Sequence, residues 1–472
     1  MNLNKNLKNL YNYIIIFLFT SFVFLSFLKF EYFQFRYLVL FLLFPCIIFL
    51  FRDLKNKNYK FIKYFLFFLL FFTIHLLINF NLDNEKIDLY NIFSLFYLLA
   101  ILLIAYYFIN IFNENINNII YLFIAIFLCS SIISFFNFQS DNAYFCGGIP
   151  DIFDLVKDKN ENIIKPHYAL KLSFKEYIFY ENSHLGMVAP SAIAFMIYHI
   201  NKKELAFNKK ILILVFLIIC YIKSSTTLFL GTTLSLLILL AFNYKEFSKK
   251  IKSIFILIIL FSTSILTFSD ECRSRFITID PVIIHSEKNY VLTEDQSLKE
   301  YMIKKIFNSK KNLIKKEDIS IFQKFINKVE DQFELSQSEY ENLTKAVHYY
   351  ALSIFKSSVF ERPFGWGINR YNKAYEYFDN KHARLHTIKK LNNMDGTNNF
   401  IKIFVEFGIF GSFFYILIFL FITEKKIPIE LKLFYFPILL TQSIRGAGYF
   451  NGGFILIAFL MLFTYINLKK KI

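Results

Sequence analysis

Long apolar runs separated by short polar segments dominate the chain. A transmembrane helix needs about 20 mostly apolar residues to cross about 30 Å of hydrocarbon, and most of the runs approach that length. They predict an all-α, polytopic integral membrane helical bundle of about 12 transmembrane helices, at residues 13–30, 37–51, 61–80, 89–109, 119–138, 184–200, 211–222, 226–243, 251–268, 398–423, 428–444 and 449–467.

The charges between these runs predict how the bundle is oriented. With the N-terminus in the cytoplasm, basic residues enrich all inner turns except 113–118; these turns are 52–60, 113–118, 201–210, 244–250, 424–426 and the tail 469–471. The outer turn 81–88 is mostly acidic. Because Lys and Arg concentrate in cytoplasmic loops, the pattern places both termini in the cytoplasm. The first apolar run lacks a small-residue cleavage site, which favours a membrane helix over a removed signal peptide.

The predicted crossings divide the chain into three parts. Residues 1–268 hold the first nine crossings, with an outer loop at 139–182. Residues 269–397 form a large, mostly helical outer loop, since apolar residues at three- and four-residue spacing over 291–345 indicate amphipathic helices. Residues 398–472 hold the last three crossings. With one large outer loop and no cytoplasmic domain, the chain is expected to work at the outer face of the membrane.

Composition and charge exclude several classes of function. The 472 residues are 56% apolar with a formal net charge of +17, and the mean hydropathy is +0.44. Much of the positive charge lies in short loops beside membrane segments, so it indicates orientation and not nucleic-acid binding. The chain lacks a GxxxxGK[ST] loop, HExxH or CxxC pairs and a GxSxG elbow, which carry ATP, zinc and serine-hydrolase chemistry. Cys146 and Cys272 both lie outside, where an oxidising compartment would permit a disulfide.

Polar residues at the outer ends of the predicted crossings are the candidates for chemistry. Glu181 and His184 lie three residues apart where a crossing begins, so they share a helix face and could accept a proton from a hydroxyl. The alternative is a helix cap, with Glu181 near the positive end of the helix. Lys223 and Arg445 stand in tight outer turns, where basic residues have no topological role. An Arg suits phosphate oxygens, whereas Lys223 could instead snorkel to lipid headgroups.

The large outer loop adds aromatic and basic residues. The only Trp of the chain, Trp366, lies in a Pro-Gly turn that is flanked by Arg362 and Arg370. Trp366 could stack on a sugar ring, but for this residue alone burial in an ordinary loop is favoured. Arg384 and His386 lie just before the tenth predicted crossing.

The start of that crossing is unusually polar. Asp395 or Thr397 is expected to cap the helix N-terminus, where free N–H groups could bind an anionic group. Lys402 and Glu406 are four residues apart and can pair, which offsets the cost of placing ionisable residues in a crossing. Gly408 and the glycine three residues later are expected to let a neighbouring helix approach closely.

The order of these features resembles the bacterial O-antigen polymerase and O-antigen ligase superfamily. The likeness consists of about twelve crossings, a large late outer loop, a P-F-G-x-G turn within it, and a closing motif from Thr397 through Gly408 to Gly411. The segments "ENSHLGM" (181–187) and "SIRGAGYFNGGF" (443–454) resemble the entry and the penultimate turn of polysaccharide polymerases. Ligases commonly carry a His where this chain has Thr397, and this departure favours a polymerase.

The resemblance implies a glycosyltransferase of the bacterial inner membrane, with its active face in the periplasm. It would join undecaprenyl-diphosphate-linked repeat units of an O-antigen or surface polysaccharide by metal-independent, inverting transfer. Glu181, His184 or His386 would take the proton of the acceptor hydroxyl. The residues expected to bind the diphosphate and sugar are Lys223, Arg362, Arg370, Arg384, Asn398 and Arg445.

The same resemblance sets the expected partners and leaves two alternatives. No cofactor is expected, and the partners would be lipid-linked glycans, membrane lipids and a chain-length regulator, with no nucleic acid. The first alternative is a ligase that transfers polymer from undecaprenyl diphosphate to the lipid A core. The second is a polysaccharide flippase or transporter, although polar residues near the bilayer midplane and repeat symmetry, which mark that class, are not evident in the sequence.

Overall fold

The computed structural model describes the chain as a set of helices with almost no other regular structure. The described residues are 2–26, 29–30, 33–83, 89–136, 182–202, 207–222, 226–268, 343–382, 394–446 and 448–470. Among them, the only strands are β1 (Lys29–Phe30) and β2 (Phe33–Gln34), which form an antiparallel pair. The predicted all-α class is confirmed over this part of the chain.

The helices follow the apolar runs of the sequence. Because hydrocarbon offers no water to hydrogen-bond, an apolar segment must satisfy its backbone N–H and C=O groups internally. The α-helices and the 3₁₀ segments (η) are α1 (Asn2–Val23), η1 (Phe35–Leu42), α2 (Leu43–Lys55), α3 (Lys60–Asp83), α4 (Leu89–Phe136), α6 (Asn182–Lys202), α7 (Phe207–Ile222), α8 (Thr226–Asn243), η2 (Tyr244–Glu246), α9 (Lys249–Phe268), α14 (Leu343–Glu361), α15 (Tyr371–His382), α16 (Asn399–Phe407), η4 (Gly408–Phe410), α17 (Gly411–Thr423), α18 (Ile429–Ile444) and α19 (Phe454–Lys470).

Length and exposed apolar surface support a helical membrane protein. In the described part of the chain, four helical stretches are long and apolar enough to cross a membrane: Arg36–Lys55, Asn91–Ile132, Thr227–Glu246 and Asn399–Thr423. Large apolar side chains also point outward, since Phe44 of α2 is 73% exposed, Phe67 of α3 64% and Phe413 of α17 63%. Contiguous surfaces of this kind are rare on soluble monomers and suit contact with lipid. The number of crossings stays a prediction.

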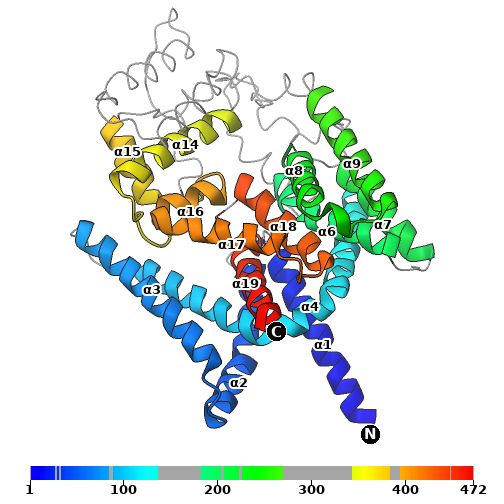
Figure 1. Ribbon diagram of the computed structural model, residues 1–472, viewed down its shortest axis with the longest axis horizontal. Coiled ribbons are helices and arrows are strands. Elements are labelled where there is room, and N and C mark those ends of the chain that lie inside the picture. Colours follow the sequence, from blue (N-terminus) through cyan, green and yellow to red (C-terminus); the bar gives the residue numbers. More distant parts are fainter. Residues whose placement is uncertain are drawn as a thin grey trace, which may run out of the picture.

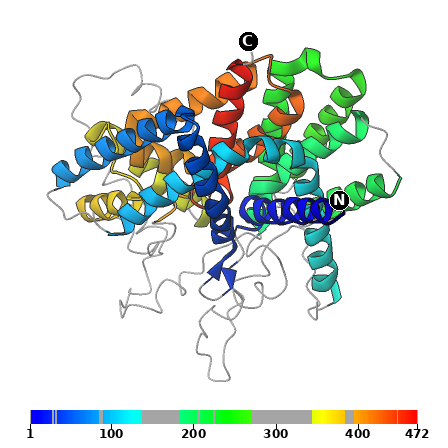
Figure 2. The same cartoon turned by 90° about the horizontal axis from the view of Figure 1, so that it is seen from below.

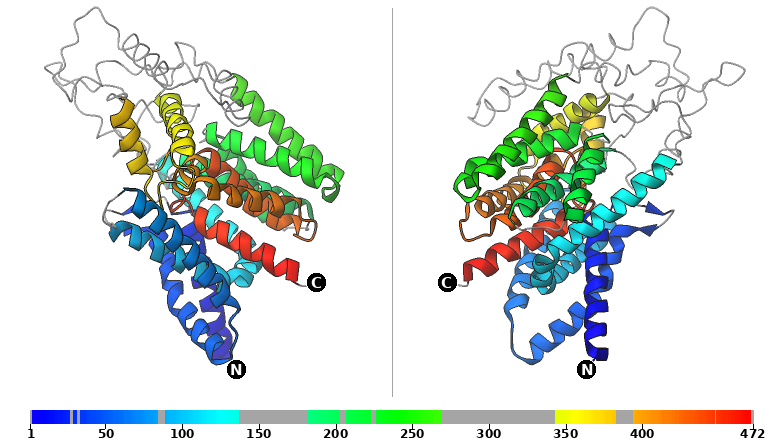
Figure 3. Two further views of the ribbon diagram at one scale, coloured as in Figure 1. Left: turned by 60° about the vertical axis from the view of Figure 1, so that its left-hand side comes forward. Right: turned by 90° about the vertical axis from the view of Figure 1, so that its right-hand side faces the viewer.

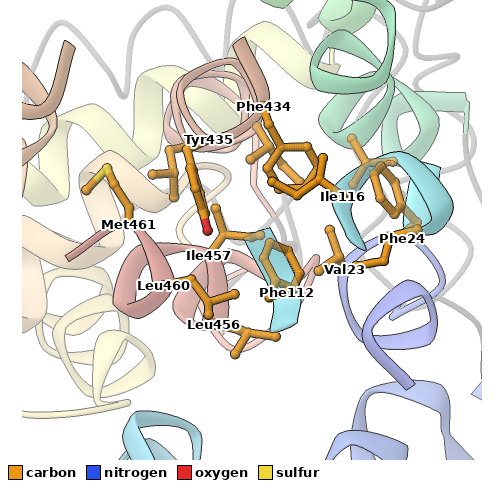
Figure 4. Close-up of a cluster of buried hydrophobic side chains, with 14 of the residues drawn as sticks. Val23, Phe24, Phe112, Ile116, Phe434, Tyr435, Leu456, Ile457, Leu460 and Met461 are labelled. Atoms are coloured by element: carbon orange, nitrogen blue, oxygen red, sulfur yellow. The ribbon is translucent and has the colours of Figure 1, made fainter. Parts of the chain in front are cut away.

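Helices α18 and α19 lie in the middle of the bundle. Helix α18 packs against α6 and α8, and α19 packs against α4. Figures 1 and 3 show α2 and α3 on one side of this pair and α7, α8 and α9 on the other. Figure 4 shows the buried apolar cluster in which side chains from the end of α1, from α4, from α18 and from α19 meet. In this cluster the rings of Phe112 and Phe434 meet edge to face, with their centroids 5.7 Å apart.

The predicted turn at 113–118 is wrong, because α4 continues through it as a single helix of 48 residues. Figures 1 and 2 show that this helix is bent near its middle. There the amide of Asn113 donates to the Thr464 hydroxyl (3.1 Å) and accepts from the Tyr435 hydroxyl (2.6 Å). The amide of Asn115 donates to the carbonyl one helical turn earlier (2.8 Å). These asparagines indicated a turn, but they bond to α18, α19 and their own helix, so no break is needed.

The crossing predicted at 398–423 is broken in the structure. Helix α16 ends at Phe407, and α17 begins at Gly411 after the short segment η4. Gly408 stands at the break with a φ of 57°, a backbone conformation that favours glycine. The two helices therefore change direction at the glycine that begins η4.

A loop from the long outer segment fills this break. The Ile409 N–H donates to the Pro363 carbonyl (2.8 Å), and the Trp366 N–H donates to the Val405 carbonyl (2.9 Å). The loop thus satisfies carbonyl groups that the end of α16 leaves free. The absence of a side chain at Gly408 makes room for this loop. The sequence had predicted that the glycine would allow close approach of a neighbouring helix.

The Gly408→Ala substitution is expected to destabilise the protein by about 3 kcal/mol or more, through left-handed strain combined with a clash. A Cβ at this position would lie 2.0 Å from the carbonyl oxygen of Pro363. Thermal unfolding of the detergent-solubilised protein measures the effect. The control Ser412→Ala, at the surface of α17, should change stability by less than about 0.5 kcal/mol. An unchanged unfolding temperature for Gly408→Ala would contradict the packing of the loop in the break.

Candidate functional site

The polar turn before α16 has an unusual backbone. Gly396 and Thr397 both have positive φ values, of 65° and 62°, and a β-branched residue with such a φ is a strained exception. The next residue, Asn398, caps the helix, and its side-chain oxygen accepts from the Ile401 N–H (2.7 Å). The predicted caps, Asp395 and Thr397, are therefore wrong. Because the chain makes a left-handed turn at Gly396 and Thr397, the helix begins after Asn398, and the Asp395 carboxyl does not cap it.

Asn398 was predicted to bind substrate, and its capping hydrogen bond gives it a measurable structural role. Asn398→Ala is expected to cost about 1 kcal/mol of stability, because the N–H of the first turn of α16 loses its acceptor. Asn398→Asp keeps an acceptor oxygen and should retain most of that stability. Unfolding temperatures of the two purified variants provide the test, and equal losses in both would show that capping is not what Asn398 contributes.

Lys402 and Glu406 of α16 form the predicted ion pair. The two charged atoms are 2.9 Å apart, and the side chains are 2% and 0% exposed. Glu406 also accepts from the N–H groups of Asn369 (2.9 Å) and Tyr371 (3.0 Å) and from the Tyr449 hydroxyl. Because Tyr371 is the first residue of α15, the carboxylate also lies at the positive end of a helix. These four donors replace the hydrogen bonds to water that the carboxylate would make at the surface, which offsets the cost of burying its charge.

The loop between α14 and α15 is also held from the side of α3. The His75 Nε2 donates to the Phe364 carbonyl (3.1 Å), and its ring lies 5.0 Å from that of Phe407. Together with Glu406, His75 fixes the loop that carries Asn369. The position of Asn369 is thereby set by two separate helices of the bundle, α3 and α16.

A cavity of about 470 Å³ opens beside this ion pair. One wall is apolar and aromatic, and it comes from η1, the start of α2 and the first turns of α4. The opposite wall is polar, and it comes from the turn before α16, the loop at 369 and the turn between α18 and α19. Its side chains are Asn369, Asp395, Lys402 and Asn451, and Arg36 of η1 adds its guanidinium to them. The cavity is therefore amphipathic, with acidic, basic and amide groups gathered at one side.

Arg36 is the basic residue at the cavity that has no acidic partner. Its guanidinium donates to the Asn451 side chain, to the Phe450 carbonyl (3.4 Å) and to the Tyr37 hydroxyl (3.1 Å). Among the residues that the structure describes, no carboxylate forms an ion pair with it. Lys402, by contrast, is neutralised by Glu406. Arg36 therefore carries a positive charge without an ion-pair partner in the described part of the chain, and an anionic ligand can bind to it.

Asp395 is the acidic residue of the cavity. Burial raises the pKa of its carboxyl above the ordinary value, and the nearby carboxylate of Glu406 raises it further. The positive charges of Lys402, Arg36 and Arg445 oppose that rise in pKa only in part. A carboxylate with a raised pKa is a stronger proton acceptor than an exposed one, which suits a general base.

The structure gives two of the predicted site residues contacts within the protein. Arg370 is 5% exposed, and with the Asn91 amide oxygen turned toward it, its guanidinium donates two hydrogen bonds (2.9 and 3.1 Å). Arg362 stacks on Trp366, with its guanidinium carbon 3.8 Å from the ring centroid. Trp366 itself is buried and donates to the Ser358 hydroxyl (3.2 Å). None of these side chains lines the cavity.

The other predicted residues are not gathered at the cavity. His184, near the start of α6, does not line the cavity. Arg445, at the end of α18, does not line it either, but the positive charge of Arg445 interacts with the Asp395 carboxyl. The remaining predictions lie outside the described residues: Glu181, Lys223, Arg384 and His386, together with Cys146 and Cys272, the predicted loop at 139–182 except for its last residue, and the amphipathic pattern over 291–342.

Sequence reasoning missed Arg36 and assigned Asp395 only to a helix cap. A signal for Arg36 existed, because it follows the first predicted crossing and so stands in an outer turn, where a basic residue has no topological role. The same reasoning identified Arg445. No local signal separates Asp395 from the other polar residues of its turn, because its role depends on partners that are distant in sequence.

Comparisons with known proteins and a search for metal sites add no assignment. No protein-family model matches the chain, and no significant match is found among curated proteins or solved structures. Within the described residues, no group of three or more His, Cys, Asp or Glu side chains is placed to hold a metal ion.

Proposed function

We propose that the chain is a membrane glycosyltransferase that polymerises lipid-linked repeat units of an O-antigen or other surface polysaccharide. The observation that carries the proposal is one amphipathic cavity that holds a guanidinium, Arg36, which forms no ion pair with a described residue, and a carboxyl of raised pKa, Asp395. Glycosyl transfer from a lipid diphosphate needs a site of this kind: a cation for the leaving group, a base for the acceptor and an apolar surface for the lipid.

The reaction would proceed as a single displacement. The Asp395 carboxylate takes the proton of the acceptor hydroxyl as that oxygen attacks the anomeric carbon of the donor sugar. The new glycosidic bond forms as the bond from the anomeric carbon to the diphosphate oxygen breaks. Undecaprenyl diphosphate leaves with the electron pair, and Arg36 stabilises its negative charge. Attack opposite to the leaving group inverts the anomeric centre.

One observation favours a polymerase over the ligase alternative. Thr397 stands where ligases carry a His, and it is 1% exposed with its hydroxyl donating to the Gly396 carbonyl (2.6 Å). That position therefore supplies no base to the cavity. The proposed base, Asp395, comes from the same turn and faces the cavity.

The proposed setting is the bacterial inner membrane, with about twelve crossings, cytoplasmic termini and a periplasmic site. The bend of α4 is compatible with this count, although the helix is not interrupted at the predicted turn 113–118. A straight helix of 48 residues would be about 72 Å long, more than twice the thickness of the hydrocarbon core. Each limb of the bent helix is long enough for one of the crossings predicted at 89–109 and 119–138.

A deletion strain tests the proposed reaction against both alternatives. Without the polymerase, single repeat units should reach the cell surface and long chains should be absent. Without a ligase, long chains would accumulate on undecaprenyl diphosphate, and without a flippase, single units would stay on the lipid carrier in the cytoplasmic leaflet. Gel separation of the surface glycan and extraction of lipid-linked glycans distinguish these results, and only the first agrees with the proposal.

A further inference from the structure

Both oxygens of the Glu406 carboxylate are fully occupied within the protein. One oxygen accepts from Lys402 Nζ (2.9 Å) and the Tyr371 N–H (3.0 Å). The other accepts from the Asn369 N–H (2.9 Å) and the Tyr449 hydroxyl. The side chain is 0% exposed and does not line the cavity. Glu406 therefore has no free acceptor for a substrate, and any effect on the reaction must act through its partners.

Those partners form much of the polar wall of the cavity. Lys402 and Asn369 line it directly. Tyr449 immediately precedes Phe450 and Asn451, which accept hydrogen bonds from Arg36. The Glu406 carboxylate therefore joins the three segments that form the polar wall of the cavity: α16, the loop before α15 and the turn before α19.

Glu406 also determines the charge that the cavity presents. Lys402 and Glu406 together carry no net charge, so the charged groups left around Asp395 are Arg36 of η1 and Arg445 at the end of α18. If Glu406 lost its charge, Lys402 would act on Asp395 uncompensated, and an added positive charge favours the ionised form of a carboxyl.

We propose that Glu406 is a positioning residue, whose carboxylate holds Lys402 in place and sets the charge environment of Asp395. This inference rests on the proposed function, because it gives Asp395 the role of base. It extends that function by assigning the control of the base to a residue that touches no substrate. Loss of the Glu406 charge should strengthen the cationic character of the site and weaken Asp395 as a proton acceptor.

A cysteine at position 395 reports this charge environment through the pKa of its thiol, and the measurement needs no glycan substrate. The five native cysteines are replaced by serine or alanine, Asp395→Cys is introduced, and alkylation of the purified full-length protein by N-ethylmaleimide is followed against pH. Adding Glu406→Gln should lower the apparent thiol pKa by about one unit, which is about a tenfold faster alkylation at a pH well below that pKa. Adding Lys402→Met with Glu406 intact should raise the apparent thiol pKa, because a positive charge is lost and the negative charge of Glu406 stays.

Two further variants make the result decisive. Ser94→Ala lies at the same cavity and changes no charge, so its thiol should titrate as in the parent. The combined Glu406→Gln and Lys402→Met variant removes both charges and should return the thiol pKa close to that of the parent, and it replaces the single Glu406 variant if that one fails to fold. Equal thiol pKa values in all variants would overturn the inference. Normal elongation by Asp395→Asn would instead overturn the proposed function and leave the thiol measurement unaffected.

Discussion

Asp395→Asn is expected to lower the rate of chain elongation by about 10²- to 10⁴-fold, the usual contribution of a general base. The amide has nearly the same shape as the carboxyl, so the contact with Gly448 should survive; a Cβ added at Gly448 would lie 2.7 Å from the Asp395 carboxyl oxygen. What the variant loses is the ability to accept the proton of the acceptor hydroxyl. Elongation by membranes that contain each protein, scored as the length distribution of lipid-linked glycan, measures the effect.

The wild-type protein adds a pH dependence to this test. Burial raises the pKa of Asp395, and only the ionised form accepts a proton. Elongation should therefore fall as the pH drops through a value above the ordinary pKa of an aspartate, and it should reach a plateau above that value. The residual elongation by Asp395→Asn should not show this fall in rate at low pH. A variant that elongates at the wild-type rate would show that another residue is the base, and the sequence candidates are Glu181, His184 and His386.

Arg36→Met is the substitution with the second-largest expected effect. A hydrogen bond to a charged group contributes about 1.5–3 kcal/mol, so loss of the guanidinium should weaken binding of the lipid diphosphate by about 10- to 150-fold. Arg36→Lys keeps the charge but loses the planar fork of donors, and it should fall between Arg36→Met and the wild type. Titration of elongation against donor concentration should show the loss mainly as a raised apparent KM.

Arg52→Met is the matched control for this substitution. Arg52 belongs to α2, which follows η1 directly, and its guanidinium lies 5.3 Å from the ring centroid of Phe49. It is exposed and does not line the cavity, so its loss should leave the donor dependence unchanged. Equal KM values for wild type and Arg36→Met, or equal losses for the Arg36 and Arg52 variants, would contradict a diphosphate site at Arg36.

Local patterns in the sequence predicted the parts of the structure that depend on near neighbours. The apolar runs predicted most helices, because a segment of this composition satisfies its backbone bonds only within itself. The pairing of Lys402 with Glu406 followed from their four-residue spacing on one helix. The cap was misplaced by a few residues, because Gly396 and Thr397 adopt left-handed conformations that composition alone does not reveal.

The remaining features depend on contacts between distant parts of the chain. Asn113 indicated a turn by its polarity, but its amide is satisfied by α18 and α19, more than 300 positions later. The cavity joins Arg36 to Asp395 and Asn451, and no spacing along the sequence encodes that meeting. For Arg362 and Arg370, the sequence likewise did not indicate the contacts within the fold, which are with Trp366 and Asn91.

Elongation by the purified protein in liposomes tests the proposed polymerase most directly. The substrate is the lipid-linked repeat unit extracted from a strain that lacks this chain, supplied alone as both donor and acceptor. The proposal predicts a ladder of lipid-linked products that grow by one repeat unit at a time, with one undecaprenyl diphosphate released at each step and no ladder with Asp395→Asn. Single units that stay unchanged in the wild-type liposomes, but are transferred when a lipid A core is added, would contradict it and favour a ligase.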